Sequence, residues 1–459
     1  MSLDIDKLFR ERQGEAYSLH EQHINPQFAK VLKTIGFDRH YVRAKGAYLY
    51  DDQGREVLDM LAGYGVFNVG RNHPGIRQAL MDSLNSERSS LVQMEAPLAS
   101  GLLAEELKKR VPRELDTVYF TNSGTEGVET ALKFARCATG RSRVLYCEKA
   151  YHGLSMGSLS VNGGGEFRGG FAPFLPNCDT VKLNDVEALR REFAKGDVGA
   201  FLVEPIQGKG VFVAEDEYLR EARRLAQENG VLLIFDEVQT GFGRTGKLFA
   251  MEHSEVIPDI LITSKALSGG FVPVGAVLTR RAVYEKVFSS MERSVVHSST
   301  FGQGALAMVA GLATLHALDE EGWVSHAARM GDLLREGLRD LQQRYELIAE
   351  VRGRGLMIGI DFARPRSLKL RLGWDLAHKV NKGLFGQAIV IPLLADHNIL
   401  TQVAGHNTDV IKLIPPLVIN DSDVNRFLEA FKAVLDRCHS FPGPVWDLTL
   451  KLARFAVRR

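Results

Sequence analysis

The chain has few cysteines and no excess of charge of either sign. Its four cysteines, in 459 residues, show no Cys-x-x-Cys or other paired spacing. This favours free thiols in a reducing compartment over a disulfide framework. The 57 basic and 56 acidic residues leave a net charge of +1. The basic excess that marks a nucleic-acid-binding protein is missing, so we expect no nucleic-acid partner.

Long apolar runs are also missing. No run approaches the roughly 20 residues that a membrane-spanning helix needs. The segment Met1–Asp6 lacks the basic flank and apolar core of a secretory signal, so we expect a cytoplasmic protein. The content of 45% hydrophobic and 25% charged residues is ordinary for a globular protein. The length allows two or three domains with a large core.

The stretch from Val231 to Lys265 organises the rest of the sequence. It holds two short apolar runs, 231–235 and 260–262, each bounded by polar residues. Such runs are typical of strands buried on both faces of a parallel sheet. Asp236 follows the first run and Lys265 the second, at the sheet edge where ligands bind in open α/β folds. An acid for a pyridinium nitrogen and a lysine for a Schiff base are what a pyridoxal phosphate (PLP) enzyme requires.

Strand-like and helix-like segments alternate from residue 76 to 330. The alternation predicts βαβ units and a mainly parallel sheet with helices on both faces. The predicted strands are 116–121, 144–147, 199–204, 231–236, 259–263 and 274–279. The predicted helices include 99–110, 126–138, 185–194, 216–229, 303–320 and 323–343. We place a domain boundary near 325–335, after which further strand and helix signals run to Cys438.

Three features lie before this alternation. Alternating residues around Gly54 predict a β-hairpin over 47–60. His20 and His23 lie three residues apart without a third ligand, so we predict a solvated helix face and no metal site. His73 precedes a proline at a helix start, which is typical of a capping residue.

The last segment, 442–459, is a basic amphipathic tail. Its apolar residues alternate with lysine and arginine. A helix of this kind could lie on a membrane or a partner protein. We expect instead that it folds back on the chain's own small domain.

A candidate phosphate site comes first along the alternating region. A strand over 118–121 leads through the loop Asn122–Thr125 into a helix that starts at Glu126. The unpaired N–H groups and the positive end of a helix N-terminus favour an anion, and Gly124 allows close approach of the backbone. Taken alone, a Ser or Thr before a helix is usually an N-cap.

Other strand ends carry further candidates. Tyr151, followed by His152, could stack on a flat cofactor ring or fill core space. Glu204 ends another strand, where a buried carboxylate is costly unless it has a role. Gln239 can donate to a ring phenolate oxygen. Lys265 is the candidate Schiff-base lysine and, once released, is placed to move a proton at the substrate Cα as a general base.

Two nucleotide-binding patterns are present but incomplete. Gly241–Lys247 fits the GxxxxGK pattern of a P-loop, but Leu248 stands where the Mg²⁺-binding Ser or Thr is needed. The glycines between 353 and 359 have the wrong spacing for a dinucleotide fingerprint. We therefore reject nucleotide hydrolysis and dinucleotide binding.

The motifs resemble those of the class III aminotransferases in order and spacing, from about residue 45 to 420. The residues that carry the resemblance are Asn122–Glu126, Tyr151–Gly153, Glu204–Gly208, Asp236–Gly246, Ser264–Lys265 and Ser299–Gly302. The family includes ornithine, 4-aminobutyrate, putrescine and other ω-amine transaminases. The resemblance implies PLP transferase fold type I, with a large α/β domain and a smaller α+β domain built from both chain ends. It also implies an obligate homodimer with shared active sites.

This resemblance divides the chain into four segments and assigns cofactor contacts. The expected segments are 1–75 (arm and small-domain segment), 76–330 (large cofactor-binding domain), 331–441 (small domain) and 442–459 (tail). The residues expected to bind PLP are Ser123, Gly124, Thr125, Tyr151, His152, Glu204, Asp236, Gln239, Lys265 and Thr300. Of these, Asp236 would hold the pyridine nitrogen, and Thr300 would reach the phosphate bound by the neighbouring subunit.

The substrate-binding positions depart from the family. Its amino-acid enzymes commonly have Glu after EPIQG and Arg before the late PPL segment, as a switchable pair that handles a carboxylate. This chain has Lys209 and Lys412 there, and two cations cannot form that pair. The departure favours a diamine, an ω-amine or a hydrophobic amine without an α-carboxylate. Tyr64, in a Gly-rich loop, and Phe67 are the other expected pocket residues.

The expected reaction is a ping-pong transamination between an amine and a 2-oxo acid or aldehyde. Three alternatives stay open: an ω-amino acid aminotransferase of ornithine or 4-aminobutyrate type, an aminomutase or racemase on the same fold, and a non-catalytic binding protein. The complete set of Asp236, Lys265 and phosphate loop argues against the last of these.

Overall fold

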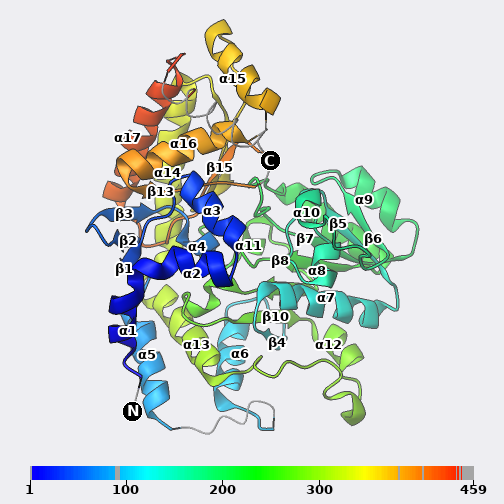
Figure 1. The fold of residues 1–459 in the computed structure, drawn as a ribbon. Helices are drawn as coiled ribbons and strands as arrows, with labels where there is room; N and C mark the ends of the chain where they lie inside the picture. Colours follow the sequence, from blue (N-terminus) through cyan, green and yellow to red (C-terminus); the bar gives the residue numbers. More distant parts are fainter. Residues whose placement is uncertain are drawn as a thin grey trace.

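A computed structural model describes residues 3–87, 94–380, 383–405, 408–440, 442–443 and 446. Its central sheet consists of β4 (Thr117–Thr121), β5 (Arg143–Cys147), β6 (Cys178–Val181), β7 (Val198–Val203), β8 (Leu232–Asp236), β9 (Ile260–Thr263) and β10 (Gly275–Thr279). The spatial order is β4-β10-β9-β8-β7-β5-β6 (Figure 1). All neighbours are parallel except β10, which runs antiparallel to both β4 and β9. The predicted mainly parallel sheet is confirmed.

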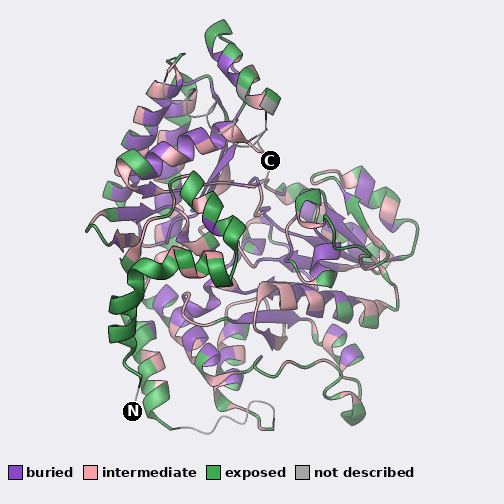
Figure 2. Cartoon of the chain, viewed as in Figure 1, coloured by how far each residue is buried: buried purple, intermediate pink, exposed green. Residues whose placement is uncertain are grey.

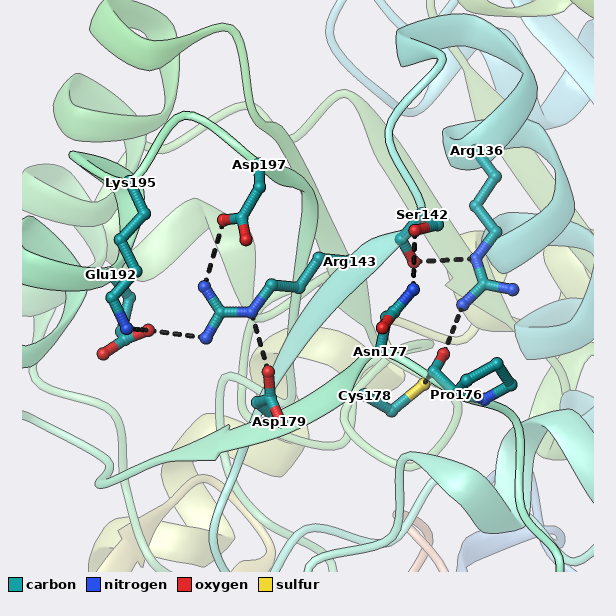
Figure 3. Close-up of polar contacts among 10 residues, drawn as sticks. All are labelled: Arg136, Ser142, Arg143, Pro176, Asn177, Cys178, Asp179, Glu192, Lys195 and Asp197. Atoms are coloured by element: carbon teal, nitrogen blue, oxygen red, sulfur yellow. Dashed lines mark hydrogen bonds and ion pairs between the residues drawn. The ribbon is translucent and has the colours of Figure 1, made fainter.

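The edge strand β6 is not predicted by the sequence. Only Val181 of its four residues is buried, so it lacks the apolar run that marks the central strands. Polar side chains hold this edge instead (Figure 3). The guanidinium of Arg143, at the start of β5, lies 2.7 Å from the carboxylate of Asp179 on β6. The same guanidinium contacts Glu192 at 2.6 Å and Asp197 at 3.1 Å, at the end of the sheet opposite the carboxyl ends of the strands.

Helices cover both faces of the sheet, as predicted. One face packs against α7 (Gly124–Thr139) and α12 (Arg281–Val287), and α8 (Met156–Ser160) packs against α7. The other packs against α6 (Leu98–Lys109), α9 (Val186–Phe193), α10 (Asp216–Asn229) and α13 (Ala305–Glu320). Because successive strand residues point to opposite faces, Leu145 belongs to one core layer and Val144 to the other. Figure 2 shows the buried strands between helices whose outer sides are exposed.

A smaller α+β part is built from both chain ends, which confirms the predicted fold class. Its strands are β1 (Tyr41–Lys45), β2 (Tyr48–Asp51), β3 (Glu56–Asp59), β11 (Ile348–Arg354), β12 (Met357–Phe362), β13 (Ile399–Leu400), β14 (Gln402–Val403) and β15 (Val410–Leu413). They form two four-stranded sheets, β1-β2-β3-β13 and β11-β12-β15-β14. The antiparallel pairing of β2 with β3 confirms the hairpin, and β13 joins β3 in parallel.

Helices from both ends of the chain surround these two sheets. The later helices are α14 (Trp323–Arg344), α15 (Leu368–Val380), α16 (Leu384–His397) and α17 (Asp421–Cys438). An arm of α1 (Ile5–Arg12), α2 (Ala16–His23) and α3 (Pro26–Thr34) precedes β1 (Figure 1). His20 and His23 lie exposed on α2, which confirms the solvated helix face. The described residues contain no group of three or more His, Cys, Asp or Glu side chains that could hold a metal ion.

Helix α5 (Pro74–Asn85) lies beside α13 and confirms the capping role of His73. His73 is the N-cap residue, and its Nδ1 accepts from the Ile76 N–H at 3.4 Å. Its Nε2 lies 2.7 Å from Glu321 at the end of α13. Both ring nitrogens of His73 are therefore engaged in contacts that hold the start of α5 in place.

Most of the tail predicted over 442–459 lies outside the described residues. Trp446 is buried, and its Nε1 donates to the Cys438 carbonyl at 2.8 Å. Its ring lies 5.5 Å from that of Phe385, so this residue packs against the small part of the molecule. Within the part of the chain that the structure describes, no helix is long and apolar enough to cross a membrane.

Candidate active site

Most of the predicted site residues meet at one cavity of about 990 Å³, a size that suits a cofactor with a small substrate. The cavity lies beside the carboxyl ends of β5, β7, β8 and β9 and is bordered on its other side by residues of α16, β14 and β15. The predicted residues that line it are Tyr64, Ser123, Gly124, Thr125, Tyr151, His152, Glu204, Lys209, Asp236, Gln239, Lys265 and Lys412.

Phe67 and Thr300 do not line this cavity. The guanidinium carbon of Arg71 lies over the Phe67 ring, 4.0 Å from the centre of that ring. The ring also packs close to Gly270. This position corrects the expectation that Phe67 is a pocket residue. Thr300 is exposed in the loop before α13. An exposed position outside the chain's own cavity leaves open the expected contact with a neighbouring subunit.

Asp236, the last residue of β8, is held by His152. Its Oδ2 lies 2.7 Å from the His152 Nδ1, and its Oδ1 accepts from the Val238 N–H at 3.0 Å. Burial lowers the pKa of His152, but the hydrogen bond to Asp236 and the charge of that carboxylate outweigh it, so the pKa is raised overall. His152 therefore acts through Asp236, whose carboxylate it orients, rather than as an independent contact.

Lys265 is a buried amine that lines the cavity. It begins the turn η3 (Lys265–Ser268) one residue after β9, with φ = +40°, a conformation that costs energy and concentrates at functional sites. Burial lowers the pKa of its ammonium, and the charges of Asp236 and Glu204 only partly offset this. Among the described residues, Lys265 makes no hydrogen bond. A cavity amine with a lowered pKa is a candidate nucleophile.

The N-terminus of α7 opens into the cavity at Ser123, Gly124 and Thr125. Ser123 is the N-cap, and its hydroxyl accepts from the Glu126 N–H at 3.3 Å. A Cβ at position 124 would lie 2.8 Å from the Val238 side chain, so packing requires glycine there. The remaining N–H groups of the first turn and the positive end of this 16-residue helix favour an anion.

Glu204 follows β7 and orders two cavity segments. It accepts from the N–H of Tyr151 at 3.0 Å and from the N–H of Gly208 at 2.8 Å. Burial raises the pKa of Glu204 to about 7 although these donors favour its charged form. Tyr151 presents its ring to the cavity, packed edge to face on Phe167 at 5.5 Å. Glu204 thus positions Tyr151 through the backbone.

Lys412 links the small sheet to the cavity loops of the large part. Its Nζ, carried by β15, donates to the Gly208 carbonyl at 2.8 Å and to Oε1 of Gln239 at 3.3 Å. The Gln239 amide in turn donates to the Tyr64 carbonyl at 2.9 Å. Burial lowers the pKa of Lys412 to about 7, and the nearby charge of Lys265 acts in the same direction. Lys412 is therefore a weak anchor for a substrate carboxylate at neutral pH.

Replacing Lys412 with methionine should change how stability depends on pH. The folded protein releases the Lys412 proton near pH 7, whereas the unfolded chain keeps it up to a pKa of 10.5. Between these values the unfolded state binds more protons, so the wild type gains stability as pH rises, by on the order of a few kcal/mol in all. Methionine removes this gain. Thermal unfolding of both cofactor-free proteins across this range measures it, and a stability difference independent of pH would contradict it.

Several positioning residues were not predicted. Asn162 accepts from the His152 N–H at 2.6 Å and donates to the Gly153 carbonyl at 2.8 Å. Glu166 forms an ion pair with Lys209. Both lie in the irregular segment after α8, where no strand end or helix start marks them. The only sequence signal is the run Gly163–Gly165 between them.

The chain is similar to known proteins along most of its length. The family model of class III aminotransferases matches residues 33–435. The aminotransferase PigE from a Serratia species is 37% identical over 454 residues, which are 92% of this chain and 53% of that protein. This chain therefore spans about half the length of that relative. The putrescine aminotransferase of Pectobacterium atrosepticum is 38% identical over 438 residues, which are 92% of this chain and 89% of that protein.

A solved structure gives the same result. The ornithine aminotransferase of Toxoplasma gondii, in which PLP partly occupies the active site, has a TM-score of 0.82 to this chain at 28% identity. The match covers 96% of this chain and 100% of that one. The family match and the two identities above 30% agree with the fold type. The chain therefore belongs to the class III aminotransferases, a family of PLP-dependent enzymes.

Proposed function

We propose that this protein is a transaminase that moves an amino group from an amine to a 2-oxo acid or an aldehyde. One observation carries the proposal. Lys265, an amine that makes no hydrogen bond within the described part of the chain, shares a cavity with the Asp236 carboxylate and with the N-terminus of α7. Family membership supports the same chemistry.

The donor set of the cavity fits PLP group by group. The N–H groups and hydroxyls of Ser123–Thr125 suit a phosphate. The Asp236 carboxylate suits a protonated pyridine nitrogen, the Tyr151 ring an aromatic face, and the Gln239 amide a phenolate oxygen. Bound there, PLP supplies the electron sink that allows a bond to the substrate Cα to break.

Each protein group then has a defined task, and Lys265 has two. Lys265 is the covalent attachment point of the cofactor, and its lowered pKa enlarges the fraction of neutral amine near pH 7. Once a substrate amine has taken its place, the freed Lys265 amine can remove the proton from Cα and return it. Asp236, oriented by His152, keeps negative charge at the pyridine nitrogen throughout. The same groups serve both half-reactions, as ping-pong chemistry requires.

The two half-reactions can be separated experimentally. PLP-loaded protein given an amine but no acceptor should release at most one equivalent of aldehyde or ketone per site and then stop. Adding a 2-oxo acid should restart turnover. A mutase or racemase would convert a single substrate continuously without any acceptor, and that result would overturn the transaminase assignment.

We also propose a homodimer with shared active sites. Large apolar side chains are exposed on α6, on α13 and on the loops beside them; they are Met94, Leu98, Leu102, Met291, Val295, Phe301 and Leu306. Thr300 is exposed next to Phe301, a member of this set, and can therefore contact a second copy of the chain. Exposed apolar residues in such number are typical of an interface. Sedimentation should give about twice the chain mass of 50.9 kDa.

The remaining expectations stay proposals. We propose the segment bounds 76–330 and 331–441 for the large and small domains; α14 spans this boundary and packs against α13 as well as α17 and β11. We propose a cytoplasmic location, which the four free cysteines favour.

A further inference from the structure

The rim of the cavity carries an ion pair that the proposed chemistry does not use. Lys209 lines the cavity directly after Gly208, and its Nζ contacts Oε1 of Glu166 in the turn η2 (Gly165–Phe167). The Lys209 side chain is 19% exposed and that of Glu166 21%. Because the pair is largely removed from water, leaving either partner alone is costly.

The surrounding backbone is built to accept this pair. A Cβ at Gly164 would lie 2.8 Å from the Lys209 Nζ and 2.5 Å from a Glu166 oxygen. A Cβ at Gly405 would lie 3.1 Å from the Lys209 Cε. The ring of Phe167 lies 5.2 Å from the same ammonium. Two segments, 164–167 and the one at Gly405, therefore enclose the lysine, and each approaches it at a glycine.

The rest of the cavity offers no charge for the far end of a substrate. Among the described lining residues, the other charged side chains are those already assigned at the reaction centre and Lys412, whose ammonium donates to Gly208 and Gln239. The apolar lining residues include Leu154, Phe167, Phe271, Val272, Val403 and Ala404. Burying an alkyl chain against such a wall stabilises the complex.

We propose that the Lys209–Glu166 pair is a two-sided charge filter that selects amines with an uncharged chain. A distal ammonium meets Lys209, which lines the cavity, and reaches the Glu166 carboxylate behind it only by displacing that lysine, which leaves one cation unpaired. A distal carboxylate must compete with Glu166 for Lys209 in the same way. An alkyl chain disturbs neither charge. This inference rests on the proposed transaminase activity and names its substrate class.

Three amines with one chain length test the filter. Hexylamine, cadaverine and ε-aminocaproate share five methylenes and end in a methyl, an ammonium and a carboxylate. PLP-loaded wild type should have its highest kcat/KM with hexylamine. Lys209→Met frees Glu166 and should raise the cadaverine-to-hexylamine ratio of kcat/KM by about tenfold, mainly through KM. Glu166→Gln frees Lys209 and should raise the ε-aminocaproate-to-hexylamine ratio by a similar factor.

Two controls separate charge pairing from general damage. The reversed pair, Lys209→Glu with Glu166→Lys, keeps opposite charges at the rim and should bring both ratios back toward the wild type. Lys195→Ala removes a lysine from the ion pair with Glu192 at the far sheet edge and should leave both ratios unchanged (Figure 3). Each single variant tests one side of the filter, so failure of one to fold leaves the other decisive.

The outcomes distinguish the filter from the proposed function. A wild type that prefers cadaverine or ε-aminocaproate overturns the filter. The filter is also overturned if a single variant moves the cadaverine-to-hexylamine and ε-aminocaproate-to-hexylamine ratios of kcat/KM in the same direction. It is likewise overturned if a single variant changes neither ratio by more than about twofold. Failure of the PLP-loaded wild type to transaminate any of the three amines with any acceptor contradicts the transaminase proposal on which the filter rests.

Discussion

Lys265→Ala should lower transaminase turnover by at least about 10³-fold. The variant loses both the attachment point of the cofactor and the group that moves the Cα proton. Lys412 is another amine of this cavity, and burial lowers its pKa to about 7, but it is held by Gly208 and Gln239 and belongs to β15. It is therefore not free to replace Lys265. Initial rates with a hexylamine donor and a 2-oxo acid acceptor measure the loss.

A second measurement shows that the loss is chemical rather than a failure to fold or to bind PLP. Borohydride treatment of the PLP-loaded wild type should add the cofactor mass to the peptide that contains Lys265. The Lys265→Ala protein should still bind PLP at the N-terminus of α7 and at Asp236, but without any covalent gain. Lys265→Arg keeps a positive charge in place of an amine nucleophile and should be equally inactive. Turnover within tenfold of the wild type in either variant would contradict the assignment.

The reaction centre is predictable from sequence because local patterns determine it. The continuous apolar runs before Asp236 and Lys265 specify buried strands, and each polar residue marks the place where a strand ends. Parallel pairing of β8 with β9 then brings both strand ends to one edge. The loop before α7 is predictable for the same reason, since it stands between a strand and a helix. Local patterns therefore suffice to place these residues together without knowledge of long-range contacts.

The substrate end of the cavity is less predictable because it depends on irregular backbone. Tyr64 has φ = +65° in a kinked turn, so spacing alone does not tell which of Tyr64 and Phe67 faces the cavity. Glu166, the partner of Lys209, lies in the segment after α8. Their contact depends on tertiary packing, which the periodic pattern of apolar residues does not reveal. The strand β6 escaped prediction for another reason: as an edge strand it carries a mixed pattern of buried and exposed residues.

Asp236→Asn should give the second-largest loss, about 10²- to 10³-fold in kcat with a smaller change in KM. Asparagine keeps the shape of the side chain but cannot hold negative charge at a pyridine nitrogen. The variant also removes the Asp236 charge that raises the pKa of His152. Burial should then outweigh the smaller effect of Glu204 and lower that pKa. NMR titration of the His152 ring in the cofactor-free proteins measures this shift independently of activity. A fall in kcat with a His152 pKa that stays raised would show that the ring is not coupled to Asp236 as the 2.7 Å contact implies. An unchanged kcat would show that the Asp236 carboxylate has no part in the reaction.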